Sequence, residues 1–174
     1  MKMIKKATAA SGILIGLSII VLFLPYKQVI AFQYENTEKV LAYVPIGEHN
    51  ATFSLQFTHS IHLTDVVETY EICDENTICQ KEISFEEFGI GMPSNAIGQE
   101  QFSEIDGRYY IKNMERIFPF IDIRIAKVYP KHLFIFNQQT FSLPEIIGSG
   151  TWVRMQAKKI TLWQQLKGVN MLDS

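Results

Sequence analysis

The sequence is poor in cysteine and, beyond its first 31 residues, poor in positive charge. It holds two cysteines in 174 residues. Four of its 16 basic residues and none of its acidic residues lie within residues 1–31, so 12 basic residues stand against 18 acidic ones in the remainder, a net charge of −6. An acidic region without a basic stripe argues against nucleic-acid binding and against a peripheral grip on anionic lipid. Contact with a membrane is therefore expected from the N-terminal segment alone.

The two cysteines are too few for a zinc site, because no second pair of ligands stands at a suitable spacing. Cys73 and Cys79 flank the polar turn 74–78. Strands on both sides of this turn would bring the sulfurs opposite each other, and in an oxidising compartment we expect a disulfide. Its short loop puts the expected stabilisation at the low end of about 2–4 kcal/mol. The alternative is two free thiols.

The N-terminus has the composition of a targeting segment. Lys2, Lys5 and Lys6 precede residues 7–24, an uncharged and mostly apolar run of 18 residues. A run of roughly 20 apolar residues can span a bilayer as a helix, and leading lysines favour a cytoplasmic N-terminus. The alternative is a secretory signal cleaved after Ala31. We therefore divide the chain into an anchor or signal, residues 1–31, and an exported domain, residues 32–174. The domain is expected outside the cytoplasm, on a single-pass anchor in the cell membrane or secreted.

The exported domain shows no internal repeat, low-complexity tract or second domain boundary. Its clearest element is residues 52–60, where Phe53, Leu55 and Phe57 alternate with polar residues as in a half-buried strand. Nine candidate strands cover residues 39–44, 52–60, 66–74, 78–88, 108–112, 121–126, 132–137, 140–143 and 151–157. Many short strands separated by turns predict a mainly β domain, an antiparallel sandwich or barrel.

One short helix is expected near the C-terminus. Thr161 and Gln164 have the spacing of a capping box, and Gly168 stands where a helix ends. Leu162, Trp163 and Leu166 are expected to pack this helix against the sheet.

Two ionisable residues occupy positions on the apolar faces of strands. By strand alternation, His59 lies on the same face as Phe57, and Glu68 lies on the same face as Val66. An unpaired buried carboxylate is costly, so we expect a strand pairing that sets His59 opposite Val66 or Glu68 and brings the imidazole and the acid together. Ser60 could hydrogen-bond within the same group.

Three interpretations of this group stay open. The simplest is a structural His–Glu link. A metal site would use His59, His62 and Glu68, and a hydrolytic triad would use Ser60, His59 and Glu68. Residues of opposite parity on a straight strand point to opposite faces, and no nucleophile elbow is present, which weighs against both of these.

A glycine-rich stretch, residues 88–96, follows the candidate strand 78–88. Gly89 and Gly91 permit backbone conformations closed to other residues, and Pro93 ends the strand. The stretch is either a bulged strand end or a loop whose amides and Met92 contact a ligand or partner. It lacks the lysine and the strand–loop–helix context of a phosphate loop.

These motifs resemble a known family. The residues concerned are Thr58, His59, Ser60, Glu68 and the tetrapeptide at 89–92. Together they resemble the signature of the domain-of-unknown-function family 1850 (DUF1850), small exported bacterial proteins. Residues 150–153 and 162–168 resemble its longer Gram-positive members. The resemblance implies an exported accessory protein without an assigned activity, of a kind often encoded beside TAXI-type tripartite (TRAP) transporters that take up small organic anions.

From the residues and the resemblance we expect a non-enzymatic, membrane-tethered accessory protein that contacts a transporter permease or its solute-binding protein. The alternative is a small-ligand or metal-binding module, and a hydrolase ranks third. No cofactor, metal ligand or catalytic residue is assigned. The expected ligand- or partner-binding surface, or its scaffold, consists of His59, Ser60, Glu68, Gly89, Gly91 and Met92.

Overall fold

Two open β-sheets build the domain in the computed structural model, which describes residues 16, 20–47, 51–89, 91–128 and 131–173. The first sheet has the strand order β13-β2-β1-β12-β9. Its strands are β1 (Lys27–Tyr34), β2 (Val40–Pro45), β9 (Ile121–Arg124), β12 (Trp152–Ile160) and β13 (Val169–Asn170). Neighbours pair antiparallel except β13, which runs parallel to β2.

The second sheet has the order β11-β10-β3-β4-β5-β7-β6, and β8 also pairs with β5. Its strands are β3 (Thr52–Thr58), β4 (Asp65–Asp74), β5 (Thr77–Phe85), β6 (Gln101–Ile105), β7 (Arg108–Lys112), β8 (Arg116–Phe118), β10 (His132–Phe136) and β11 (Gln139–Ser142). The expected mainly β class is confirmed, and each of the nine candidate strands overlaps an observed one. Neither sheet closes on itself, so the barrel alternative is wrong.

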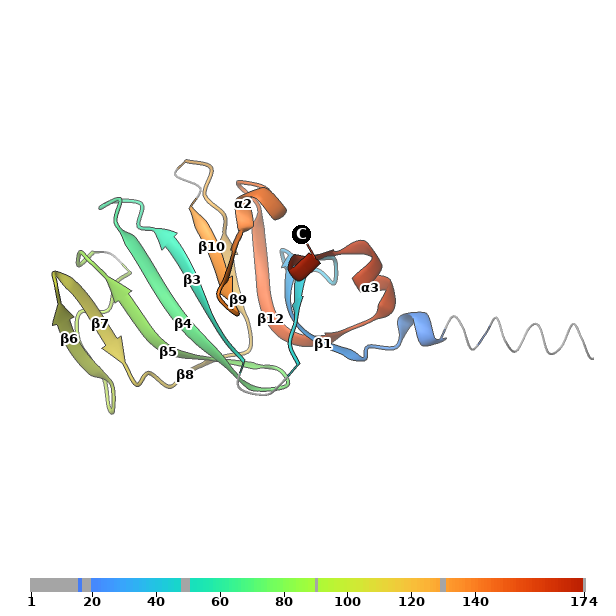
Figure 1. Cartoon of the computed structure of the whole chain (residues 1–174), viewed down its shortest axis with the longest axis horizontal. Coiled ribbons are helices and arrows are strands. Elements are labelled where there is room, and N and C mark those ends of the chain that lie inside the picture. The colour runs from blue at the N-terminus through green and yellow to red at the C-terminus, as the bar shows by residue number, and fades with distance from the viewer. Residues whose placement is uncertain (1–15, 17–19, 48–50, 90, 129–130, 174) are drawn as a thin grey trace, which may run out of the picture.

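The two sheets share one hydrophobic core. Phe32 on β1 meets Phe134 on β10 edge to face, with ring centroids 5.3 Å apart. Phe53 and Leu55, predicted to face inward on β3, are buried in the same core. Figure 1 shows the larger sheet on the left and the smaller one on the right, with β10 and β12 near the middle. Beyond this shared core, the larger sheet carries a second apolar cluster formed by Val66, Ile83, Phe85, Ile111 and Met114.

Strand β1 was not expected. It pairs with β2 on one side and β12 on the other, and residues 29–32 are fully buried. A strand covered on both faces is continuously apolar, so in the sequence it looks like the end of the N-terminal apolar segment. The boundary placed after Ala31 therefore passes through the middle of a core strand.

The N-terminal segment is described only in part. Residues 16 and 20–23 are helical, whereas residues 1–15 and 17–19 of the expected anchor or signal lie outside the described residues. Within the described part of the chain, no helix combines the length and the hydrophobicity that crossing a membrane requires.

The expected C-terminal helix is α3 (Leu162–Lys167), and its capping box between Thr161 and Gln164 is confirmed. The expected packing against the sheet is wrong for Trp163 and Leu166, whereas Leu162 is partly buried. Trp163 is 43% exposed, Leu166 is 68% exposed, and no residue of α3 is fully buried. Two further short helical elements, α2 (Leu143–Ile146) and η1 (Met171–Asp173), were not expected.

The cysteine expectation is confirmed. Cys73 and Cys79 are disulfide-bonded across the β4–β5 hairpin, with their Cα atoms 6.0 Å apart.

Candidate functional site

The register of β3 and β4 separates the two ionisable residues. Leu55 stands opposite Glu68, and Phe57 stands opposite Val66. The expected pairing of His59 with Val66 or Glu68 is therefore wrong. His59 instead donates its backbone N–H to the carbonyl of Thr64, at 2.8 Å. His59 lies four positions after Leu55, about 13 Å at the usual strand rise of about 3.3 Å per residue, so His59 and Glu68 belong to different sites.

The first site is a turn in which two histidines stack. The rings of His59 and His62 lie 5.2 Å apart at 23°, although straight-strand geometry would make them diverge. They meet because the chain turns back after His59, where the N–H of Leu63 donates to the His59 carbonyl at 2.9 Å. The Nδ1 atom of His59, whose residue is 8% exposed, accepts from the backbone N–H groups of Ile61 and His62 at 3.4 Å each.

The glycine stretch lies against this histidine pair. A Cβ atom on Gly89 would lie 2.8 Å from Nε2 of His62 and 3.2 Å from Cε1 of His59, so a side chain at this position would displace the His62 ring. Met92 donates its N–H to the Gly89 carbonyl at 3.0 Å, and its side chain packs on the second apolar cluster. We call these residues, His59, His62, Gly89 and Met92, the histidine–glycine turn.

Two other predicted residues lie near this turn. Ser60 is exposed, and Gly91 is exposed with φ +90°, in the left-handed region that glycine tolerates best. The structure thus brings together the histidine and glycine motifs of the sequence and leaves Glu68 elsewhere.

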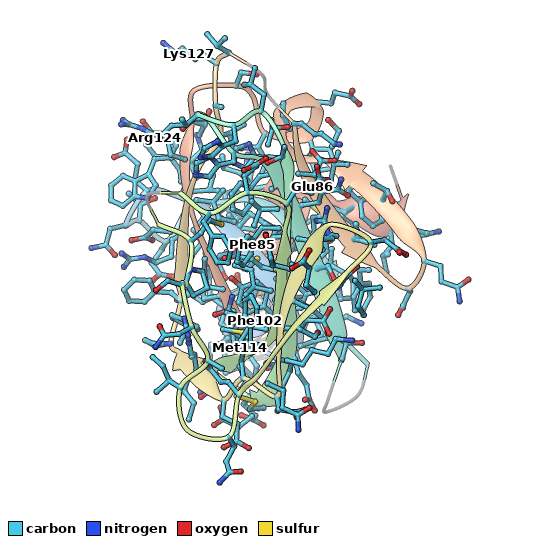
Figure 2. The ribbon with its side chains drawn as sticks, turned by 90° about the vertical axis from the view of Figure 1, so that its left-hand side faces the viewer. Phe85, Glu86, Phe102, Met114, Arg124 and Lys127 are labelled. Atoms are coloured by element: carbon cyan, nitrogen blue, oxygen red, sulfur yellow. A yellow bond between two sulfur atoms is a disulfide. The ribbon has the colours of Figure 1, made fainter. Side chains whose placement is uncertain are left out.

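The second site, which we call the inter-sheet cavity, contains Glu68 and has a volume of about 440 Å³. It lies where the chain crosses from β8 on one sheet to β9 on the other. Its apolar walls include Leu55, Phe57, Phe118, Phe120, Ile121 and Ile123. Its polar lining consists of Gln56, Glu68, Tyr70, Gln80, Asp122, Arg124 and His132. In the view of Figure 2, Arg124 of the lining lies near the edge of the molecule, and Phe85 and Met114, which belong to the second apolar cluster and not to the cavity, lie nearer the middle.

Glu68 is partly buried on the inner face of β4. The Tyr70 hydroxyl donates a hydrogen bond to its carboxylate at 2.8 Å. Burial raises the pKa of Glu68, against the opposing effect of the Tyr70 hydrogen bond. Burial and the neighbouring Glu68 raise the pKa of Tyr70, whose ring stacks on Phe53 with centroids 5.4 Å apart.

His132 was not among the predicted site residues. Its ring stacks on Phe57, with centroids 5.9 Å apart. Its Nδ1 atom is buried, and no hydrogen-bond partner for it lies among the described residues. Burial lowers the pKa of His132. The alternation of His132 with Phe134 and Phe136 already indicates an inward position, by the same parity that drew attention to His59.

A polar assembly fixes one wall of the cavity. The guanidinium of Arg154 lies 3.6 Å from the ring centroid of Phe120. It donates two hydrogen bonds to the carboxylate of Asp122, at 2.8 and 2.9 Å. This bidentate pair limits the motion of the aromatic wall.

The cavity combines apolar walls with Glu68, with Asp122, which Arg154 already pairs, with Arg124 and with one buried imidazole nitrogen. Such a lining recognises a small, mostly apolar molecule that carries a hydrogen-bond donor. Within the described residues, no group of three or more histidine, cysteine, aspartate or glutamate side chains could hold a metal ion.

Comparison with known proteins gives one match. A family model described as a domain of unknown function (DUF1850) matches residues 53–143, slightly more than half of the chain. The matched part includes the histidine–glycine turn and the strands β3, β4, β5 and β10 that border the cavity. No curated protein and no solved structure matches.

Proposed function

The chain belongs to the DUF1850 family, and from its geometry we propose a non-enzymatic, membrane-tethered extracytoplasmic domain that binds a small organic molecule in the inter-sheet cavity. One observation carries the proposal: the carboxyl group of Glu68 is set among apolar walls of a cavity of about 440 Å³. That volume lies in the range typical of small-molecule sites.

The lining favours a small organic cation. A carboxylate among apolar walls is poorly solvated, so a ligand that donates N–H bonds to it would supply the missing interaction. The apolar walls suit a short hydrocarbon body. An organic anion would place its charge against Glu68, so the expected ligand differs in charge from the solutes of TAXI-type transporters.

The membrane tether is supported by the sequence and by the position of β1. Most of the apolar run 7–24 lies outside the described residues, but the folded domain begins at Lys27, directly after it. Cleavage after Ala31 would remove most of the buried half of β1, which favours an uncleaved anchor. The disulfide is typical of an oxidising compartment.

A role beside a transporter is proposed on the family resemblance. The expected partner is a permease or solute-binding protein. A pull-down from membranes with the full chain as bait tests this contact, and recovery of neither transporter component would remove this part of the proposal.

Ligand binding is tested with a matched pair of probes, hexylammonium and hexanoate. Calorimetry on the full chain in detergent at neutral pH should detect the cation and not the anion. Glu68→Gln should weaken hexylammonium binding at least about tenfold, equivalent to about 1.4 kcal/mol.

The matched control is Glu71→Gln. Glu71 lies on the same strand but on the other face, where it pairs with Lys81 at 3.2 Å, so its loss should leave the affinity unchanged. Absence of hexylammonium binding, or equal binding by the Glu68→Gln protein, would overturn the proposed ligand site.

A further inference from the structure

Exposed apolar side chains gather where the N-terminal segment joins the domain. Trp163 and Leu166 on α3 are exposed, and the ring of Phe23 lies 6.0 Å from that of Trp163. Other exposed apolar residues of this region are Ile20, Val21, Leu24, Tyr26, Val169 and Leu172. In Figure 1, α3 lies at the same end of the molecule as residues 20–26, the blue segment that leads into β1. We call Phe23, Trp163 and Leu166 the α3 surface.

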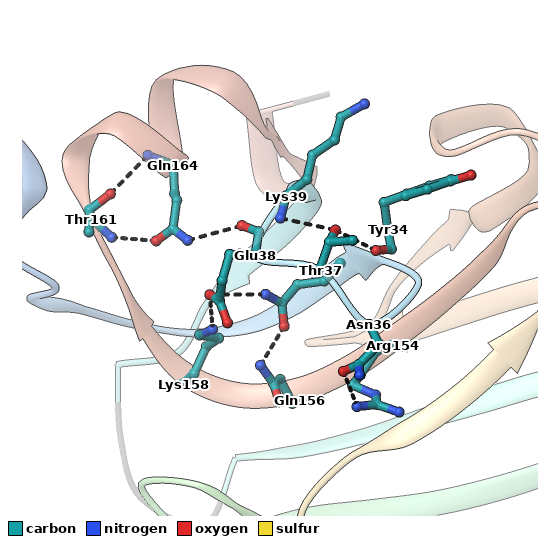
Figure 3. Close-up of polar contacts among 11 residues, drawn as sticks. Tyr34, Asn36, Thr37, Glu38, Lys39, Arg154, Gln156, Lys158, Thr161 and Gln164 are labelled. Carbon is teal, nitrogen blue, oxygen red and sulfur yellow. Dashed lines mark hydrogen bonds and ion pairs between the residues drawn. The ribbon is translucent and has the colours of Figure 1, made fainter.

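Helix α3 is held firmly, so the exposure of these residues does not reflect a loose helix. Gln164 closes the capping box with Thr161 and also donates to the Glu38 carbonyl at 3.2 Å (Figure 3). Glu38 in turn forms an ion pair with Lys158 at 2.8 Å. At the other end of the helix, a Cβ atom on Gly168 would lie only 3.1 Å from Cγ1 of Val40. The helix therefore presents Trp163 and Leu166 outward in a fixed position.

The apolar run that precedes the domain indicates what covers the α3 surface. An exposed apolar patch of this kind marks an interaction surface. Phe23 of this patch belongs by sequence to the apolar run 7–24, the segment that we propose enters the membrane. Tryptophan and tyrosine favour the membrane–water interface, and Lys167, whose Nζ lies 4.8 Å from the Trp163 ring centroid, can extend its amine towards headgroups.

We propose that the α3 surface lies in the headgroup region of the membrane that holds the N-terminal segment. This inference rests on the tether in the proposed function and does not depend on the ligand. The inference adds a second membrane contact to that of the N-terminal segment, which is the only contact expected from the sequence. A domain attached at two points has a defined orientation, whereas a domain on a single tether does not.

The orientation places the cavity wall away from the lipid. On β12, Ile160 pairs with Lys27 at the membrane end, whereas Trp152 pairs with Arg124 of the cavity lining. Ile160 lies eight positions after Trp152, about 26 Å along the strand. The part of the cavity near Arg124 would thus face the aqueous side, where a soluble ligand or partner can reach it.

The two tryptophans provide a test with an internal control. The full chain is reconstituted in phosphatidylcholine–phosphatidylglycerol vesicles with or without brominated acyl chains, which quench nearby tryptophan. The Trp152→Phe protein reports on Trp163, and the Trp163→Phe protein reports on Trp152. Bromolipid should quench Trp163 at least about twofold more than Trp152, since only Trp163 would lie at the interface.

Substitutions of one exposed leucine and one exposed valine sharpen the test. In the Trp152→Phe background, Leu166→Asp should reduce the quenching of Trp163. Val128→Asp should not, because Val128 is 73% exposed and lies beyond the Trp152 end of the sheet. Both side chains are exposed, so neither substitution should disturb the fold.

Equal quenching of the two tryptophans would overturn the α3 contact while leaving the tether in place. A chain that does not float with the vesicles would overturn both tether and contact, and hexylammonium binding would still test the cavity separately. Chain-to-chain crosslinking through α3 without bromolipid quenching would assign the surface to a second copy and also overturn the inference.

Discussion

The histidine–glycine turn and the inter-sheet cavity both contain inward-facing polar side chains. The two regions differ in how far the protein itself supplies hydrogen bonds to these side chains. In the turn, two backbone N–H groups donate to Nδ1 of His59. In the cavity, Glu68 receives the Tyr70 hydroxyl and otherwise faces open volume, and Nδ1 of His132 has no partner among the described residues. Strand parity thus tells which side a polar group faces, and the local backbone decides whether the protein itself completes its hydrogen bonds.

This difference gives the two regions separate roles. A buried polar group that the fold satisfies contributes to stability, and removing it leaves its partners unsatisfied. A polar group that the fold satisfies only in part is available to a ligand and lowers stability when the site is empty. Substitutions in the turn should therefore change stability, and substitutions in the cavity should change affinity.

The largest effect is expected for His59→Ala. It leaves the N–H groups of Ile61 and His62 without their acceptor and removes a buried ring, which should cost about 2–3 kcal/mol of unfolding free energy. Urea denaturation measures the loss. The exposed neighbour provides the control, since Ser60→Ala should change stability by less than about 0.5 kcal/mol. If the folded His59→Ala protein also lost hexylammonium affinity as Glu68→Gln does, the two regions would form one site.

An intermediate effect of opposite sign is expected for Glu68→Gln. The raised pKa means that folded Glu68 holds its proton more tightly than the unfolded chain. Its contribution to stability is full below the ordinary value of 4.5 and is lost as the pH rises through the folded pKa. The substitution should therefore stabilise the empty protein by about 1 kcal/mol at neutral pH, with little gain at pH 4.

Urea denaturation of both proteins between pH 4 and pH 8, without ligand, measures this difference. A Glu68→Gln protein that is less stable than the unsubstituted chain at pH 7 would show that the carboxylate is structural, and the contrast with the turn would fail.

Alternation and turn residues report local geometry, so they predict nine of the observed strands, but they miss the short strands β6, β8 and β13. The sequence does not predict β1, because an apolar strand in the centre of a sheet has the same composition as the end of an anchor. The sequence also does not predict the β3–β4 register, because the connecting loop can shift the pairing of the two strands. In the observed register Glu68 stands opposite Leu55, away from His59. The position of His132 could have been predicted from parity, but its place in the cavity depends on β8 and β9 crossing between sheets, a tertiary feature.

The smallest effect is expected for His132→Phe, and it appears only in acid. Burial lowers the pKa of His132 in the folded state, so the unfolded chain takes up the proton more readily. Stability is then full above the ordinary value of 6.5 and falls as the pH drops through it towards the folded pKa.

Phenylalanine keeps the stacking on Phe57 and cannot be protonated. The two proteins should differ by less than about 0.5 kcal/mol at pH 7.5, and the substituted protein should lose less stability on going to pH 5. If both proteins lost the same stability between pH 7.5 and pH 5, the acid sensitivity would come from another group. His132 would then not be one of the incompletely hydrogen-bonded groups that distinguish the cavity from the turn.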